Sequence, residues 1–388
     1  MREDVRHIGW LLGGMLMLLL LMACSSSSSE DDETGLQPQE KPVLKLYIFA
    51  PESPIVTRSD NGNVNATADE KALNTFDVWV FETGTSTLVS YLHLSNQTFD
   101  GQQEVTMEVS DEFADKAQKP NVDIFVAANV AASNCGLSLQ RSTTSTELQA
   151  AAIAHTATGD YFGLTAPVLS VPVEGLPMSG MLTDQVVSGT APVFTAKTNN
   201  VKLVRAVSKI RFVFSKSTSA PEISNLSVKL NSGVLPTKEF LFLDGIYPDK
   251  RSRIDAEAGT EGEQTLISGV SDGDINAVTD PAQYATYTVG QGQAYETKIN
   301  SGIENRYLSE LGRFYLRESE EKLKGTVNYT LGGTAKSANF EMKTERDFTR
   351  NHTWIVYGYF LGSGDLMLNL VDVKSWTDKE ENNKVHNW

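Results

Sequence analysis

The chain has 388 residues, with 33 lysines and arginines against 49 aspartates and glutamates, so its formal net charge is −16. This acidic balance argues against a nucleic-acid-binding protein, because phosphate contacts need an excess of basic side chains. The two cysteines are too few for a disulfide framework or a cysteine-based zinc site. With 40% hydrophobic residues, the length predicts about two domains with substantial cores.

The first 23 residues are typical of an export signal. An uncharged apolar run covers residues 8–22 and follows two arginines, Arg2 and Arg6. This run is shorter than the roughly 20 residues of a membrane span and fits the core of a signal peptide. It ends in Leu21-Met22-Ala23-Cys24, which resembles a bacterial lipobox. We expect cleavage before Cys24 and lipidation of its thiol; an ordinary signal peptide with an incidental cysteine is the alternative.

Residues 24–40 form an acidic, serine-rich tether. Ser25–Ser29 are followed directly by Glu30-Asp31-Asp32-Glu33, a composition too polar to pack into a core. A serine-rich acidic stretch behind a lipidated cysteine resembles the surface-export signal of Bacteroidota lipoproteins, although a plain linker would look the same. The expected location is the cell surface, with Cys24 attached to outer-membrane lipid. The one other cysteine, Cys135, is expected to be a buried apolar residue.

From residue 41 onward the pattern is that of an all-β protein. Short alternating apolar segments are bounded by Gly, Pro, Asn and Asp. One short helix is expected at residues 146–154, capped by Thr144 or Ser145, and residues 249–277 suggest surface loops. The expected strands cover residues 43–49, 76–81, 88–94, 104–109, 122–128, 201–214, 226–230, 240–242, 284–289, 312–316, 326–330, 338–342, 353–360 and 366–373.

A polar, turn-prone stretch at residues 191–200 suggests a domain boundary. It divides the chain into an N-terminal β-sandwich at residues 41–197 and a C-terminal β-sandwich at residues 198–388. Each half has about the length of one sandwich.

Residues for catalysis or metal binding are not apparent in the sequence. None of the five histidines has metal-ligand spacing, and Ser179 lacks the surroundings of a nucleophile elbow. The sequence Asp272-Gly273-Asp274 could hold a cation but fits a solvated turn better, and Gly290-Gln291-Gly292 also indicates a turn. We therefore expect no enzymatic activity, no metal and no cofactor.

Five segments carry a resemblance to a known family. In their order, behind a lipobox, they resemble the fimbrillin superfamily, the FimA/Mfa-type subunits of type V pili in Bacteroidota. The resemblance implies two transthyretin-like Greek-key β-sandwich domains in tandem. The segments are residues 71–81, which end in Val80-Phe81; residues 122–129, which end in Ala128-Asn129; Leu176–Gly180, expected as a loop; Val204–Ile210; and Arg350–Trp354.

The resemblance also implies an assembly mechanism. A protease cuts after an arginine behind the first strand, the strand is lost, and the C-terminal segment of another subunit fills the groove. Arg58 is the only arginine between Cys24 and Arg141, so the implied cut lies between Arg58 and Ser59; an ordinary surface arginine is the alternative. The removable piece within the first domain is residues 41–58, with its apolar face at Leu44, Leu46 and Ile48.

The donor candidate is residues 366–388, in which Leu366, Leu368 and Leu370 repeat the three-residue apolar face. The alternative is that residues 366–373 are simply the last strand of the second sandwich. The predicted function is that of a stalk or tip subunit of a surface pilus with a role in adhesion. Its expected partners are other pilus subunits and an adhesion target. A non-polymerising surface lipoprotein that binds glycan or host protein, through tyrosines such as Tyr284 and Tyr307, and a membrane-anchored base subunit remain the alternatives.

Overall fold

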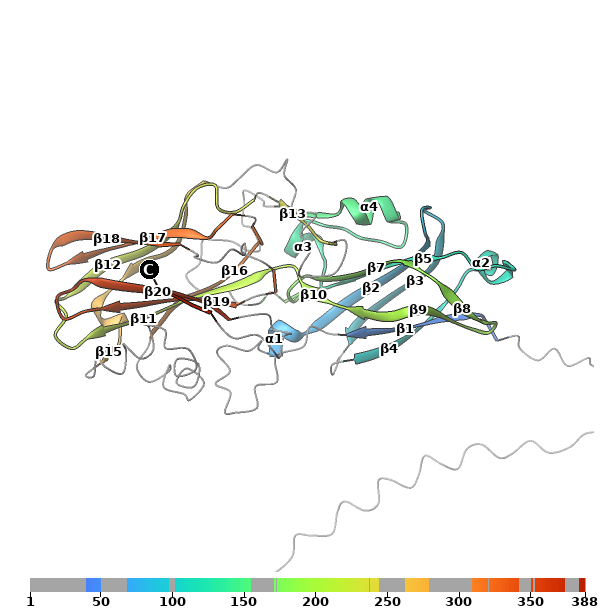
Figure 1. The fold of residues 1–388 in the computed structure, drawn as a ribbon, viewed down its shortest axis with the longest axis horizontal. Coiled ribbons are helices and arrows are strands. Elements are labelled where there is room, and N and C mark those ends of the chain that lie inside the picture. The colour runs from blue at the N-terminus through green and yellow to red at the C-terminus, as the bar shows by residue number, and fades with distance from the viewer. Residues whose placement is uncertain are drawn as a thin grey trace, which may run out of the picture. The chain divides into compact units, whose positions relative to one another are not determined.

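The computed structural model describes residues 40–49, 68–97, 102–154, 171, 173–236, 238–243, 262–278, 309–319, 321–341, 350–351, 353–373 and 384–387. Residues 41–388 form one compact unit. Strands dominate the described parts, and the helices are short (Figure 1). The predicted all-β class is confirmed. None of the described helices is long and apolar enough to cross a membrane.

Two sheets form the first sandwich. Alternating side chains bring them together: Leu44 and Leu46 of one sheet share a core with Val78 and Val80 of the other. The first sheet has the order β4 (Gln102–Glu108), β1 (Val43–Phe49), β9 (Val193–Lys202), β8 (Val187–Thr190). The second has the order β10 (Val204–Arg205), β7 (Met178–Gln185), β5 (Val122–Ala128), β2 (Leu73–Glu82), β3 (Leu88–Gln97).

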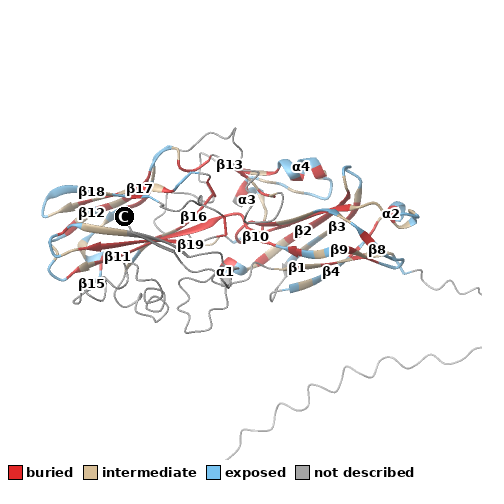
Figure 2. Cartoon of the chain, in the orientation of Figure 1, coloured by how far each residue is buried: buried red, intermediate tan, exposed pale blue. Residues whose placement is uncertain are grey.

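Two further sheets form the second sandwich around a separate core that includes Phe212, Val228, Val327 and Trp354. Strands β11 (Ser208–Ser217) and β19 (Thr353–Phe360) are buried along almost their whole length (Figure 2). One sheet has the order β15 (Ala277–Val278), β11 (Ser208–Ser217), β19 (Thr353–Phe360), β20 (Leu366–Val373), β21 (Lys384–Asn387), with β16 (Ser309–Leu316) also paired to β11. The other has the order β14 (Gln264–Val270), β12 (Ile223–Leu230), β17 (Lys324–Leu331), β18 (Thr334–Glu341).

The predicted helix is shorter than expected. Helix α4 spans Ser145–Ala150, and a capping box at Thr144 begins it: the Glu147 N–H donates to Thr144 Oγ1 (3.2 Å) and the Thr144 N–H to Glu147 Oε2 (2.7 Å). Residues Ala152–Ala154 instead form β6, which pairs with β13 (Lys238–Phe240). Strand pairing with a distant segment has overridden the helical propensity of the alanines. The other helices are α1 (Ala68–Lys71), α2 (Asp111–Asp115) and α3 (Ala132–Cys135).

Several predicted strand boundaries are wrong. Residues 201–214 are not one strand, because β9 ends at Lys202 and β11 begins at Ser208, with the short β10 between them. Residues 264–270 form β14 rather than a loop, since Leu266 and Ile267 are buried in the second core. Residues 178–180, predicted as loop, open β7.

The stretch predicted as a domain boundary, residues 191–200, lies mostly in β9. Its pairing with β1 contains a register shift: Lys45 opposes Thr195, but Tyr47 opposes Asn200. The turn-prone residues thus interrupt a strand's register. Whether the domains divide there stays a prediction.

Cys135 is buried, as predicted, and burial raises the pKa of its thiol to about 11. The expected strand at 284–289 and the tyrosines near it lie outside the described residues.

Candidate functional site

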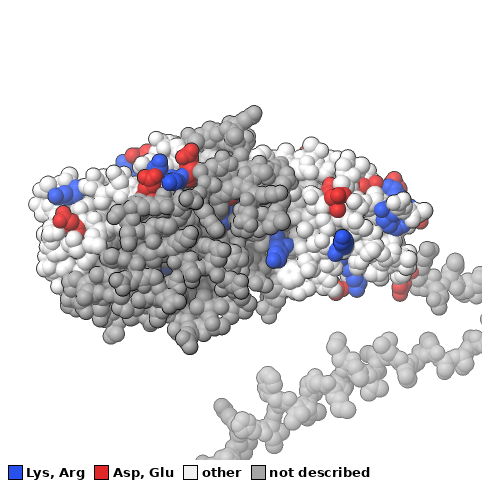
Figure 3. Space-filling model, in the orientation of Figure 1, with Lys and Arg blue, Asp and Glu red and all other residues white. Residues whose placement is uncertain are grey.

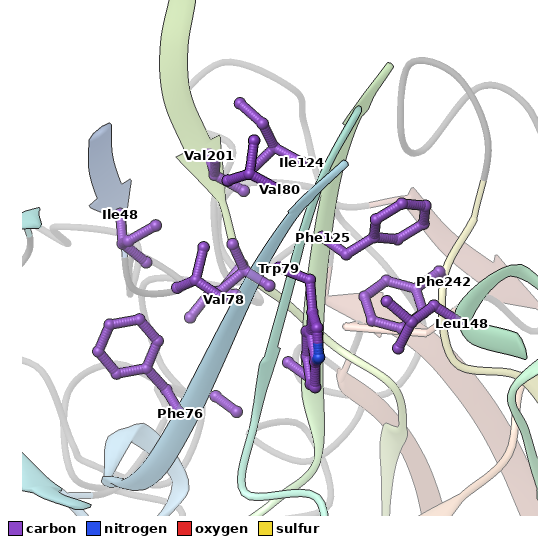
Figure 4. Close-up of a cluster of buried hydrophobic side chains, with 14 of the residues drawn as sticks. Ile48, Phe76, Val78, Trp79, Val80, Ile124, Phe125, Leu148, Val201 and Phe242 are labelled. Carbon is purple, nitrogen blue, oxygen red and sulfur yellow. The ribbon is translucent and has the colours of Figure 1, made fainter. Parts of the chain in front are cut away.

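Strand β1, which carries the predicted removable face, lies inside a sheet. It pairs antiparallel with β4, where Val43 opposes Glu108 and Phe49 opposes Gln102, and parallel with β9. The side chains of Leu44, Leu46 and Ile48 are 0% exposed. In Figure 4 the side chain of Ile48 lies on the same side of β2 as Phe76 and Val78. Removing β1 would therefore leave a slot between β4 and β9 whose floor is the first core.

The outer face of β1 is polar. Lys45 Nζ donates to Glu104 Oε1 (3.1 Å) and the Tyr47 hydroxyl donates to Glu104 Oε2 (3.0 Å). The hydrogen bond from Lys45 lowers the pKa of the Glu104 carboxyl. Such exposed pairs contribute little to stability, whereas each buried leucine or isoleucine contributes roughly 1.5–3 kcal/mol. The inner face and the two ladders hold β1 in place.

The other candidate site residues of the N-terminal region, Cys24, Arg58 and Ser59, lie outside the described residues. After Phe49, the next described residue is Ala68, where α1 begins.

Strand β20 contains the donor candidates. It pairs antiparallel with β19 along its whole length, from Leu366 opposite Phe360 to Val373 opposite Thr353, and its second half pairs with β21. Leu366 and Leu368 are half-buried against the second core, and the side chain of Leu370 lies outside the described residues. In this structure β20 is a strand of the second sandwich.

Helix α1 follows the undescribed segment 50–67 and is anchored by a buried carboxylate. Glu70 is 0% exposed. Its two oxygens accept from Lys209 Nζ (3.1 Å each), and Oε1 also accepts from the Tyr315 hydroxyl (2.5 Å). Arg205 Nε donates to the Glu70 backbone carbonyl (2.9 Å). Desolvation lowers the pKa of Lys209 to about 8 and that of Arg205 to about 9, against the attraction of Glu70.

Arg205 also connects two of the segments that carry the family resemblance. Its Nη1 donates to Asn351 Oδ1 (3.2 Å). The neighbouring Arg350 donates from Nε to Glu318 Oε1 (2.7 Å) and from Nη1 to the Leu241 carbonyl (3.0 Å). The arginines at 205 and 350 are thus structural. Sequence reasoning missed Glu70 and Glu318, because nothing in their local sequence distinguishes them from surface carboxylates.

A third family segment ends at Asn129, which is buried and has a left-handed backbone conformation (φ 56°). Its Oδ1 accepts from the Asn74 N–H (2.8 Å), and its Nδ2 donates to the carbonyls of Ala72 (2.7 Å) and Leu176 (3.0 Å). A Cβ at Gly175 would lie 2.4 Å from Asn129 Nδ2, so only glycine fits there. The segment before β7 is fastened to the end of β5 in this way.

The carboxylates of Asp272 and Asp274 are used within the fold. Asp272 pairs with Lys216 and accepts from the Ile223 N–H (3.1 Å). Asp274 accepts from the Ser271 N–H (2.8 Å) and closes a single turn. Among the described residues there is no group of three or more His, Cys, Asp or Glu side chains that could hold a metal ion.

Residues 44–231 match the family model of the major fimbrial subunit protein (FimA). The chain resembles the fimbrillin superfamily. The predicted resemblance is confirmed, and the match begins at Leu44 on β1 and extends through β12. No match is found among curated proteins.

Several solved structures are similar to this chain. A proposed cell adhesion protein from Parabacteroides distasonis is 15% identical, with a TM-score of 0.52, over 88% of this chain and 99% of that one. A fimbrial assembly protein from the same organism is 14% identical (TM-score 0.46; 90% and 100% covered). The tip fimbrial protein Mfa3 from Porphyromonas gingivalis is 12% identical (TM-score 0.45; 89% and 100% covered).

The first of these structures shows the shared fold. The family match supports a role for the fimbrillin-like chain as a pilus subunit or adhesin, and the matched proteins are not enzymes. The absence of catalytic motifs from the sequence agrees with this comparison.

Proposed function

We propose that the chain is a stalk or tip subunit of a surface fimbrium that polymerises by donor-strand exchange after proteolysis. The observation that carries this proposal is the position of β1, an internal strand with a fully buried face that is joined to the rest of the protein through a single segment, residues 50–67. A cut after Arg58 would separate β1 from α1 without breaking any described strand. The lipid on Cys24 would leave with the removed piece.

Three features make the emptied first sandwich a receptor for another strand. The edges of β4 and β9 would each present unpaired backbone groups, and both favour a new ladder. The pockets vacated by Leu44, Leu46 and Ile48 favour a segment with alternate apolar residues. Helix α1 stays anchored through Glu70 and Lys209, which lie on the retained side of the cut.

The donor is proposed to be residues 366–388 of a second copy or a related subunit. Because β20 pairs with β19 in this structure, donation requires either that β20 leaves β19 or that only residues 374–388 reach out, in which case β21 must leave β20. We also propose two domains, with the boundary near residue 203 instead of the predicted 197, because β9 continues to Lys202. The lipidated precursor would sit on the outer membrane and join the fimbrium after processing.

Polymerisation can be tested with the chain from Pro38 onward. Brief treatment with an arginine-specific protease, followed by an unboiled denaturing gel, should give a ladder of multimers. Arg58→Ala should abolish the ladder. Arg141→Ala, which removes an exposed arginine from the same sandwich, is the matched control and should leave the ladder unchanged.

Two truncations locate the donor. Deletion of residues 366–388 should give cleaved subunits that do not polymerise, and deletion of residues 374–388 alone tells whether β20 itself is needed. Leu368→Asp serves the same purpose if the longer deletion does not fold. A cleaved chain that stays monomeric would contradict the proposal and favour a non-polymerising surface lipoprotein. Mass spectrometry of the exported protein, with Cys24→Ala as control, tests lipidation.

A further inference from the structure

A pocket of about 410 Å³ opens on the first sandwich, away from the β1 slot. It is lined by side chains of β2 and β3, by the segment around Leu139 and Arg141, and by Glu174 before β7. Its volume falls within the range of small-ligand sites, roughly 300–1,000 Å³. Neither strand exchange nor the buried junction at Glu70 uses these residues.

The polar groups of the pocket are held in place and are only partly used. Asp77 Oδ1 accepts from the Tyr91 hydroxyl (2.6 Å) and lies 2.7 Å from His93 Nδ1. Glu174 Oε1 accepts from Ser133 Oγ (2.7 Å). Among the described residues, neither carboxylate makes any other hydrogen bond. The second oxygen of each can therefore accept from a ligand.

Arg141 supplies the complementary donors. Its side chain is exposed and makes no hydrogen bond or ion pair with any residue in the described part of the chain. An arginine presents a planar set of N–H donors that suits paired oxygen acceptors. The pocket is thus lined by two carboxylate acceptors, Asp77 and Glu174, and by the Arg141 guanidinium, which carries several N–H donors.

The walls of the pocket are fixed by buried or semi-buried bonds. Trp79 Nε1 donates to the Gln140 carbonyl (2.9 Å), which fastens the segment beside Arg141. Asn129 fastens the segment beside Glu174 through the Leu176 carbonyl. The ring of Tyr91 lies 5.6 Å from that of Trp79, centroid to centroid. The site is preorganised, which lowers the entropic cost of binding.

An exposed apolar residue directly precedes Glu174 in the chain. Val173 is 92% exposed, although its backbone carbonyl is held by Asn74 Nδ2 (2.7 Å). Leu139 and Val130 add further apolar surface to the lining. Apolar side chains beside polar groups that can make further hydrogen bonds are suited to a ligand with both C–H and O–H groups.

We propose that this pocket binds a neutral saccharide. Its hydroxyls would donate to Asp77 and Glu174 and accept from Arg141, while its C–H face would pack on Leu139 and the Tyr91 ring. A ring bearing hydroxyls on its edge and C–H groups on its face matches this arrangement. The two carboxylates disfavour an anionic sugar through charge repulsion. The proposal does not depend on polymerisation, because cut and uncut chains both retain every residue of the pocket.

The test uses the uncut Arg58→Ala chain, so that failure of strand exchange does not affect it. Saturation-transfer NMR is performed with glucose, galactose, mannose, N-acetylglucosamine and N-acetylgalactosamine, followed by titration of any sugar that gives a signal. Asp77→Asn and Arg141→Ala should each weaken binding about tenfold or more, as expected for loss of a hydrogen bond to a charged group.

Asp115→Asn and Lys336→Ala, both at exposed positions outside the pocket, are the matched controls and should bind as the parent does. Circular dichroism establishes that each variant is folded. Binding that survives both pocket substitutions would overturn the proposal. So would a response to none of the neutral sugars at millimolar concentration, or a response only to N-acetylneuraminate, glucuronate or a free amino acid.

Discussion

Strands β1 and β20 share one sequence pattern but occupy different environments. Each has apolar residues at three alternate positions. In β1 these side chains are 0% exposed, with a paired strand on either side over the full length. In β20 Leu366 and Leu368 are only half-buried, and β21 covers just the second half of the strand.

The difference shows that alternation alone does not tell how tightly a strand is held. The inner face of β1 is complementary to the first core, so an isolated first sandwich would be unstable without it or a replacement. The face of β20 is less completely covered, which lowers the cost of moving it. This distribution of burial is compatible with the proposed exchange of strands.

The largest loss of stability should follow removal of the Glu70 carboxylate, which anchors helix α1. Glu70→Ala leaves the Lys209 ammonium buried without its carboxylate partner, and we expect a loss of about 3–5 kcal/mol in unfolding free energy. Urea titration measures it. Glu263→Ala removes the partner of Lys229 in an exposed pair and should change the stability little. If Glu70→Ala lowered the unfolding free energy no more than Glu263→Ala does, the α1 anchor would contribute little to stability.

The contrast between the two strands is tested directly by a pair of truncations. Leu46→Ala should lower the unfolding free energy by about 3 kcal/mol, because it leaves a cavity in a closed core. Leu368→Ala should cost about 1 kcal/mol, because its side chain is already half in solvent. Both are measured by urea unfolding of the uncut chain. A larger loss at Leu368 would reverse the comparison.

A pH dependence of the stability is expected at Glu239 on β13, which lies beside Arg350 just before β19. Desolvation raises the pKa of the Glu239 carboxyl to about 8, against the attraction of Arg350. The folded protein therefore keeps a proton that the unfolded chain loses near its usual pKa of 4.5. This contribution to stability is complete below pH 4.5 and is lost as the pH rises through about 8.

Glu239→Gln, which cannot ionise, should flatten that part of the stability profile between these limits. Unfolding midpoints recorded from pH 5 to pH 9 measure the slope. An unchanged slope in the variant would show that Glu239 does not titrate in this range.

The sequence predicted what depends on local pattern. Alternating or continuous apolar segments located β1, β5, β19 and β20. The helix was expected to be capped by Thr144 or Ser145, and Thr144 caps α4. The sequence did not predict that Ala152–Ala154 would form a strand, since β6 exists only because β13 pairs with it. Nor did it find β14, whose two buried residues stand in a polar context.

The family motifs were recognised before their role was apparent. Arg205 and Asn351 are 146 positions apart and meet through one hydrogen bond. Glu70, which Arg205 and Lys209 both contact, has no motif of its own. Long-range polar contacts of this kind follow from the tertiary fold, so single-sequence reasoning could not assign them. The pocket beside Asp77 was missed for the same reason, since Arg141 and Glu174 reach it from separate segments.

On the described part of the face in Figure 3, the surface charge does not favour a partner of either sign. Acidic and basic side chains lie close to one another on this part of the face in Figure 3. The excess of acids is best understood as favouring solubility at the cell surface. Specific recognition would then depend on the shape of two sites: the proposed slot between β4 and β9, and the pocket beside Asp77.

The mixed pairing of β1 has a consequence for the polarity of the fibre. One neighbour of β1 runs parallel to it and the other antiparallel. A replacement strand entering in either direction would therefore form one ladder of each type, and the backbone hydrogen bonds distinguish the two directions only weakly. In the proposed fibre, the head-to-tail sense would therefore be encoded in side-chain shape along the three pockets that β1 vacates.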